Sequence, residues 1–326
     1  MILVTGANGF IGSFICRQLL QQGHQVRALK RKNSNMALVQ GLDGPINWLT
    51  LDLEDLAEVA NALAGVQTVI HCAAVISMQK HDRDLMYRVN VEGTRNLVNQ
   101  ALHKGIQRFI HISSVAAIMN DKAEGLLTEN TRWEESATQT TYGYTKHLAE
   151  LEVARAAAEG IDTAIINPSL VIGPGLVNQG STSIFGQVAH HHRNLVNGQV
   201  NYVDVREVVS AVMATLTGNH HNQRFILNAG TTTYEKLYAQ IAEILNVRPP
   251  RVISNGFQLK LAYLFSGLWS MVTQKPAISK ELLKRRRQPV AYDGTKAAQA
   301  LSIQYRPLND TLQWAVSQLQ ANGQLA

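Results

Sequence analysis

Short apolar runs alternate along the first half of the chain with longer segments in which apolar residues recur every three or four positions. The runs predict strands, because short apolar stretches bounded by turn residues are typical of strands buried on both faces. These strands are expected at residues 1–5, 25–29, 46–51, 68–72, 108–112 and 163–166. The helical patterns include residues 84–102 and 142–159. This alternation predicts an α/β fold with a doubly wound parallel sheet, which binds ligands at the carboxyl ends of its strands.

The alternation ends near residue 167, and the remainder predicts a smaller, mostly helical domain. A strand is expected at 224–227 and helices near 232–246, 257–273 and 308–320. We therefore assign residues 1–167 and 198–229 to a dinucleotide-binding domain. Residues 168–197 and 230–326 are assigned to a discontinuous substrate-binding domain.

Three glycines follow the first predicted strand and precede a helical pattern. Glycines at such a turn let the backbone approach a pyrophosphate, while the helix N-terminus offers N–H groups and a positive dipole end. The spacing is Gly-x-x-Gly-x-x-Gly. The expected cofactor contacts in this turn are Gly6, Asn8, Gly9, Phe10, Ile11 and Gly12.

A basic run, Lys30-Arg31-Lys32, follows the second predicted strand at the position where an acidic residue would accept the ribose hydroxyls of NAD. No carboxylate is present there, and cations suit the 2′-phosphate of NADP, with Arg31 the best bidentate donor and Lys30 beside it. The sequence therefore favours NADP over NAD. The alternative is an exposed basic turn.

Further cofactor contacts are expected after the third and fourth strands. Asp52, followed by Leu53, either accepts from the adenine amine or caps the next helix. Ala73 and Ala74 come after the fourth strand, where small side chains let a flat cofactor lie against the backbone.

Tyr142 and Lys146 are four residues apart in a predicted helix and would share one of its faces. An ammonium beside a phenol favours the phenolate, so Tyr142 could exchange protons nearer neutral pH. The alternative for such a pair is surface decoration. Ser113 and Ser114 follow the fifth strand at its carboxyl end, where a serine also serves as a turn or cap residue.

Composition narrows the class of protein. The chain has 326 residues, 45% of them hydrophobic, and a net charge of +6, yet its densest basic run, Lys284 to Arg287, is short and predicts a solvated face rather than nucleic-acid binding. Cys16 and Cys72 lie in apolar stretches and form no disulfide framework. Because the chain opens on a strand, with no room for a cleaved signal, a cytoplasmic protein is expected.

No metal site and no integral membrane segment are expected. The run His190 to His192 has no accompanying carboxylate or thiol cluster, and it is expected to line a substrate cleft instead. The apolar stretch 259–272 is interrupted by polar residues and is too short to span a bilayer. Packing within its own domain and lying on a membrane surface are the two alternatives for this segment.

Taken together, the motifs resemble the extended short-chain dehydrogenase/reductase superfamily of the NAD-dependent epimerase/dehydratase type, over nearly the whole chain. The matching segments, in chain order, are Thr5 to Gly12, Asp52-Leu53, His71 to Ala74, Val89 to Thr94, Ser113-Ser114, Tyr142-x-x-x-Lys146, Pro168 to Pro174, and Tyr202 to Arg206. Within the superfamily, Val26 to Arg31 and Tyr292 to Ala297 look like the dihydroflavonol-reductase-like branch, whose members reduce carbonyls with NADPH.

The resemblance implies a Rossmann-like domain and a role for each matched residue. Tyr142 corresponds to the catalytic tyrosine, Lys146 to the lysine that lowers its pKa and holds the nicotinamide ribose, and Ser114 to the hydroxyl that orients the substrate, with Ser113 the neighbouring candidate. Asn90 supports the active-site geometry and is also counted among the cofactor contacts. Pro168 and Val171 complete the cofactor contacts. Asn167 is a departure, because many relatives have arginine there.

The predicted function is an NADP-dependent oxidoreductase that reduces a ketone or aldehyde to an alcohol. One alternative is a nucleotide-sugar epimerase or dehydratase with retained NAD, and another is a non-catalytic NADP-binding redox sensor. The substrate is a small carbonyl or alcohol molecule of unspecified class. Relatives often dimerise through helices corresponding to 84–102 and 142–159, so the resemblance also predicts a homodimer.

Overall fold

A computed structural model of the protein describes residues 1–42, 44–120, 125–135, 139–191, 195–253 and 290–325. The centre of the larger part is a seven-stranded sheet in the order β10-β6-β5-β4-β1-β2-β3, parallel throughout. Its strands are β1 (Ile2–Thr5), β2 (Val26–Lys30), β3 (Ile46–Thr50), β4 (Thr68–His71), β5 (Arg108–Ile112), β6 (Asp162–Pro168) and β10 (Gln223–Leu227). The strand order reverses between β1 and β4, where a doubly wound sheet opens a ligand crevice. The predicted Rossmann-like fold is confirmed.

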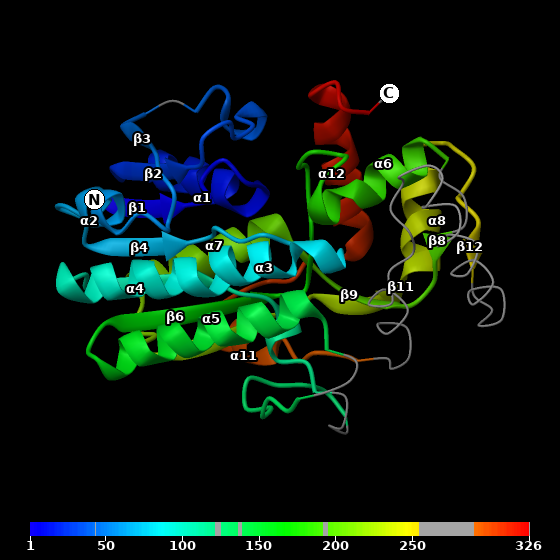
Figure 1. Ribbon diagram of the computed structural model, residues 1–326. Helices are drawn as coiled ribbons and strands as arrows, with labels where there is room; N and C mark the ends of the chain where they lie inside the picture. Colours follow the sequence, from blue (N-terminus) through cyan, green and yellow to red (C-terminus); the bar gives the residue numbers. More distant parts are fainter. Residues whose placement is uncertain (43, 121–124, 136–138, 192–194, 254–289, 326) are drawn as a thin grey trace.

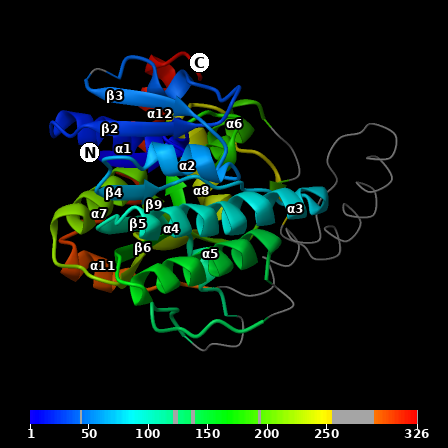
Figure 2. The same ribbon diagram turned by 60° about the vertical axis from the view of Figure 1, so that its left-hand side comes forward.

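Helices cover both faces of this sheet, as Figures 1 and 2 show. Helices α2 (Leu56–Ala62), α4 (Gly93–His103) and α5 (Thr141–Ala158) pack on one face, and α1 (Phe10–Gln21) and α7 (Val205–Thr217) on the other. Successive strand residues point to opposite faces, so Phe109 joins the core under α4 and α5 while Ile110 joins the core under α1 and α7. The central residues of the strands therefore supply apolar side chains to both faces of the sheet.

The predicted helix 84–102 is observed as three joined segments. They are α3 (Arg83–Met86), the π-helical η3 (Tyr87–Glu92) and α4. A π-turn inserts one residue into the helical repeat and rotates the following side chains, and such turns often occur at functional sites. Asn90 lies inside it.

The smaller part contains more strand than its apolar pattern predicts. Strands β7 (Leu170–Ile172), β9 (Gln199–Asp204) and β11 (Gly230–Thr233) form a three-stranded sheet, and β8 (Leu195–Val196) pairs with β12 (Val252–Ile253). Helices α6 (Ser183–Ala189), α8 (Tyr234–Ile244) and α12 (Leu308–Ala321) pack around a separate apolar core that includes Phe185, Leu237 and Leu312. The predicted helix at 257–273 and the basic run at 284–287 lie outside the described residues.

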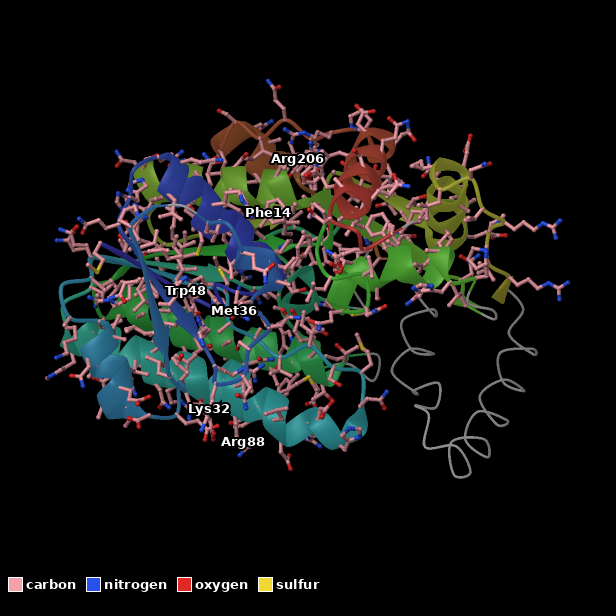
Figure 3. The ribbon with its side chains drawn as sticks, turned by 90° about the horizontal axis from the view of Figure 1, so that it is seen from above. Phe14, Lys32, Met36, Trp48, Arg88 and Arg206 are labelled. Carbon is pink, nitrogen blue, oxygen red and sulfur yellow. The ribbon has the colours of Figure 1, made fainter. Side chains whose placement is uncertain are left out.

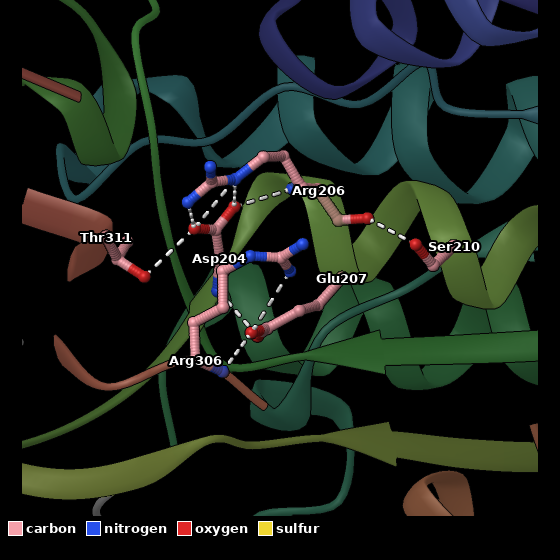
Figure 4. Close-up of polar contacts among 6 residues, drawn as sticks. All are labelled: Asp204, Arg206, Glu207, Ser210, Arg306 and Thr311. Atoms are coloured by element: carbon pink, nitrogen blue, oxygen red, sulfur yellow. Dashed lines mark hydrogen bonds and ion pairs between the residues drawn. The ribbon is translucent and has the colours of Figure 1, made fainter. Parts of the chain in front are cut away.

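The Tyr202 to Arg206 motif joins the two parts of the chain (Figure 4). Asp204 and Glu207 form a capping box at the start of α7, and Asp204 also accepts hydrogen bonds from Arg206 and from Thr311 of α12. The backbone N–H of Arg306 donates to Glu207 at 2.6 Å. Asp204 and Glu207 are both 1% exposed, so these bonds satisfy two buried carboxylates and fix the carboxyl-terminal segment to α7.

The domain division stays a prediction, and one segment departs from it. Residues 295–303 were assigned to the smaller domain, but Ala297 of α11 (Thr295–Ala300), Leu301 and Ile303 belong to the apolar core under α1 and α7. Among the described residues, no helix is both long and apolar enough to cross a membrane.

Candidate active site

The glycine turn connects β1 to α1 and lies against the loop after β4. Gly6 has φ +61°, and a Cβ on it would be 2.9 Å from the backbone of Ala73. A Cβ on Gly12 would overlap the carbonyl oxygen of Gly6. The first turn of α1, which includes Phe10, contains no acidic residue. This glycine cradle and the open positive end of α1 suit a dinucleotide pyrophosphate.

The basic loop after β2 is tied to the glycine turn. The Asn8 Nδ2 atom donates to the backbone oxygen of Asn35 at 3.0 Å. Arg31 and Lys32 are exposed, and Lys30 ends β2; Figure 3 labels Lys32 and Met36 in this loop. In the described part of the chain, none of the three basic side chains forms an ion pair. The loop therefore offers unneutralised cations beside the glycine cradle.

Asp52 does not cap the helix that follows it, so that alternative is wrong. Asp55 is the N-cap of α2 and accepts from the backbone N–H groups of Ala57 and Glu58. Asp52 is exposed and accepts only a local hydrogen bond from the Glu54 N–H at 3.1 Å. Leu53 packs near Gly93, where a Cβ would be 3.3 Å from the Leu53 side chain. The adenine contact of Asp52 stays a prediction.

Asn90 joins three parts of the site. Its Oδ1 accepts from the Val75 N–H at 2.7 Å, and its Nδ2 donates to the Val75 oxygen at 2.9 Å and to Thr145 Oγ1 at 3.1 Å. The loop containing Ala73 and Ala74 is thereby fixed to both the π-turn and α5. Asn90 is 1% exposed, which makes it a support beneath the site.

Helix α5 carries the tyrosine and the lysine one turn apart. Thr140 caps the helix by accepting from the Gly143 N–H. Lys146 is 1% exposed, and its Nζ donates to the Ile112 oxygen at 2.7 Å. Tyr142 is buried as well. Burial lowers the pKa of Lys146 to about 8. Tyr142 and Lys146 are therefore not an exposed surface pair. Both lie on the buried side of α5, which packs on the sheet near the carboxyl ends of the strands.

The two adjacent serines have different surroundings. Ser113 is buried, and its hydroxyl donates to Glu150 Oε1 at 2.5 Å. Ser114 is partly exposed, and its Oγ accepts from the Ala116 N–H at the start of the short turn η4 (Val115–Ala117). An accepting hydroxyl keeps its own proton for another acceptor. Of the two serines, Ser113 has committed its hydroxyl proton to Glu150, whereas the Ser114 hydroxyl donates to no described residue.

A buried charge cluster lies behind the serines and was not predicted. Glu150, 1% exposed, accepts from Ser113, from Asn167 Nδ2 and from Arg224 Nη2, the latter two at 2.5 Å. Asn167 also donates to the Ser114 oxygen at 2.9 Å. The position where many relatives carry arginine thus helps to fix the loop that contains Ser114. Glu150 is one of two glutamates in α5, and nothing in the sequence distinguishes the buried one from the other.

A row of polar side chains under the site was also missed. Thr5, His71 and His111 are in register on β1, β4 and β5, and Lys146 of α5 reaches His111. Each occurs singly within an apolar strand. A signal was available, since all three occupy equivalent positions near the carboxyl ends of predicted neighbouring strands.

Pro168 and Val171 lie where the chain passes from the large sheet into the small one. Pro168 ends β6 beside Leu227 of β10, and buried Val171 is in β7 opposite Val203. His190 and His191 follow the last residue of α6, Ala189, and His192 lies outside the described residues. Their role in a substrate cleft stays a prediction. No group of three or more possible metal ligands is found in the ranges that the structure describes.

Comparison with known proteins matches residues 2–230 to the model of the NAD dependent epimerase/dehydratase family. The chain belongs to this family. A putative dihydroflavonol 4-reductase of Synechocystis sp. is 31% identical, with 98% of this chain and 94% of the relative covered. Cinnamoyl-CoA reductase 1 of Oryza sativa subsp. japonica is 32% identical over 65% of this chain and 66% of its own. These relatives confirm the dihydroflavonol-reductase-like branch.

The fold is shared with solved structures over the whole length. The crystal structure of gox2253 superimposes with a TM-score of 0.85 at 28% identity, covering 100% of this chain and 99% of that one. Family and relatives together identify the protein as an NAD(P)-dependent oxidoreductase.

Proposed function

We propose that the protein reduces a ketone or aldehyde to an alcohol with NADPH, using Tyr142, Lys146 and Ser114. The observation that carries this proposal is the buried Lys146, one helical turn from Tyr142 and hydrogen-bonded to the backbone at the end of β5. A lysine with a pKa of about 8 keeps its positive charge at neutral pH. That charge favours the phenolate form of the neighbouring tyrosine.

Tyr142, Lys146 and Ser114 each have a separate role in the reduction of the carbonyl. When bound, the nicotinamide cofactor supplies the hydride. Tyr142 donates a proton to the carbonyl oxygen as it becomes an alkoxide, and Lys146 stabilises the phenolate that remains. Ser114 donates a hydrogen bond to the same oxygen, whose charge develops only in the transition state. Carbonyl, hydride and proton together give the alcohol.

The preference for NADPH is supported by the basic loop. Arg31 and Lys32 are exposed, without ion-pair partners in the described ranges, and Asn8 fixes their loop against the glycine turn. An acidic residue at this point would repel a 2′-phosphate, and none is present. The same loop argues against the epimerase alternative with retained NAD. Purified protein that carries tightly held NAD would favour that alternative.

The resemblance also supports a homodimer through α4 and α5. Leu151 on α5 is 52% exposed, which is consistent with an apolar contact to a second copy. Light scattering of the purified protein tests this proposal. A monomer at micromolar concentration would exclude it.

The decisive test of the activity is Tyr142→Phe, which removes only the phenolic oxygen. We expect NADPH binding to persist while turnover of an accepted carbonyl, found by a screen that follows NADPH absorbance, falls by about 100-fold or more. Tyr144→Phe is the matched control, because Tyr144 lies on the same helix with 39% of its surface exposed. Equal turnover of the wild type and Tyr142→Phe would reject the proposed mechanism.

A further inference from the structure

Lys146 lies above a row of three buried polar side chains. Thr5, His71 and His111 occupy paired positions on β1, β4 and β5, and the rings of His71 and His111 are 5.2 Å apart. Both histidines are fully buried. Burial lowers the pKa of His71 to about 3 and that of His111 well below its ordinary value, so both rings are neutral.

Both ring nitrogens of His71 are occupied by hydrogen bonds. Thr94 donates its hydroxyl proton to the Asn90 oxygen at 2.6 Å, so it must accept from His71 Nε2, 2.9 Å away. The other ring nitrogen, Nδ1, is then an acceptor for the Thr5 hydroxyl at 2.7 Å. Thr5 in turn accepts from the Ala73 N–H. His71 is therefore a structural link between the end of β1, just before the glycine turn, and the first turn of α4.

His111 differs from His71, because its one hydrogen bond among the described residues is made with Lys146. The His111 Nε2 atom is 3.3 Å from Lys146 Nζ, and Nδ1 has no hydrogen-bond partner in the described part of the chain. An ammonium is a donor only, so Nε2 must accept from it and the ring proton must be on Nδ1. The Nδ1–H of His111 thus has no acceptor among the described residues, while Nε2 keeps the contact with Lys146.

We propose that His111 is a positioning residue for the Lys146 ammonium. One N–H of Lys146 is accepted by His111 Nε2 and a second by the Ile112 oxygen. The third has no acceptor among the described residues and is left for the cofactor side of the site. This inference rests on the role proposed above for Lys146. It adds that His111 holds the Lys146 ammonium in its orientation.

The other groups around Lys146 show why a neutral acceptor matters there. His71 ends β4 and Cys72 follows it, and Tyr142 and Glu150 lie on α5 with Lys146. Burial raises the pKa of the Cys72 thiol, which therefore stays uncharged. Glu150 raises the pKa of Lys146, but its oxygens already accept from Ser113, Asn167 and Arg224. In the described ranges, His111 is thus the side chain that makes a direct hydrogen bond to the ammonium.

The first test needs no variant. In protein labelled with ¹⁵N-histidine, the nitrogen chemical shifts of His111 distinguish its tautomers. We expect the neutral Nδ1–H form at pH 7. A ring with its proton on Nε2, or a charged ring, would overturn the proposal. The signal of His111 is assigned by its loss in His111→Gln.

The second test compares His111→Phe with His111→Gln by NMR titration of ¹³C-labelled lysine, with the Lys146 signal assigned through Lys146→Met. Phenylalanine removes the acceptor, so the pKa of Lys146 should fall by about one pH unit or more, whereas the glutamine oxygen should largely restore it. Equal titration in the wild type and His111→Phe would contradict the proposal. Neither measurement depends on turnover, so a failure of the proposed reductase activity is recognised separately.

Discussion

Gly143 lies so close to Ala116 that a Cβ at position 143 would be 2.6 Å from the Ala116 carbonyl oxygen. This contact brings the first turn of α5, with Tyr142, against the turn η4 that follows Ser114. Real Cβ atoms are not found at such a distance from a carbonyl oxygen, so a side chain at 143 must push the two segments apart. The spacing between the proton donor and the hydroxyl of the proposed site therefore depends on a glycine.

Gly143→Ala should consequently lower kcat by about tenfold to 100-fold, because displacements near 1 Å in an active site have effects of this size. NADPH affinity should change little, since the glycine turn is untouched. Gly198→Ala is the control, because a Cβ at position 198 would meet no atom within 4 Å. Steady-state kinetics of the two variants decide the matter, and an unchanged kcat in Gly143→Ala would show that the contact does not set the geometry.

The serine pair offers a second prediction, in which adjacent residues have opposite effects. Ser114→Ala should reduce kcat by about 100-fold through loss of a hydrogen bond to the developing alkoxide, with little loss of stability. Ser113→Ala should instead lower the free energy of unfolding by about 1–3 kcal/mol, because it removes a donor to the buried Glu150. Kinetics and urea unfolding of both variants test the assignment. The reverse pattern would make Ser113 the substrate-facing hydroxyl.

The large sheet could be predicted from the sequence because most of its strands have a short, mainly apolar run, as in β1 and β5, and alternate with helical patterns. Strand β7 and the two-residue strands β8 and β12 are too short to give such a pattern, and they pair with partners far along the chain. The π-turn around Asn90 depends on backbone hydrogen-bond register, which hydrophobic periodicity does not record. Short or irregular elements were therefore missed.

For the site, the spacing of Tyr142 and Lys146 identified the pair, and the glycine turn indicated the cofactor. Among their supports, Asn90 was expected, whereas His111 and Glu150 were not. His111 and Glu150 acquire their roles only from contacts across the sheet, with Lys146 and with Arg224. A single polar residue in an apolar segment has many possible structural roles, and only its three-dimensional partners distinguish them.

Cofactor choice gives a third prediction. Arg31→Glu should weaken NADPH binding by about 1.5–3 kcal/mol, a factor of roughly 10 to 150, and leave NADH binding nearly unchanged, because only NADPH carries the 2′-phosphate. Lys104→Glu makes the same charge reversal at an exposed position after α4 and controls for net charge. Fluorescence titration with both cofactors measures the difference. Equal losses for NADPH and NADH would show that Arg31 does not read the phosphate.

The buried ammonium of Lys146 should also leave a signature in the pH dependence of stability. Its pKa in the folded protein is about 8, against an ordinary value of 10.5. Below pH 8 the folded state carries the full cost of burying the charge. Between pH 8 and 10.5 the folded lysine loses its proton while the unfolded one retains it, so stability rises with pH. Above 10.5 both forms are neutral and the cost is gone.

The wild type should therefore gain stability relative to Lys146→Met as the pH rises from 8 to 10.5, by up to about 3 kcal/mol. At pH 7 the methionine variant should be the more stable of the two, although it would be inactive, since it buries a similar volume without a charge. Urea unfolding at pH 7, 8, 9 and 10 gives the difference directly, and Lys104→Met, at an exposed position, is the control. If the difference in unfolding free energy between the wild type and Lys146→Met stays constant over this range, burial does not lower the pKa of Lys146.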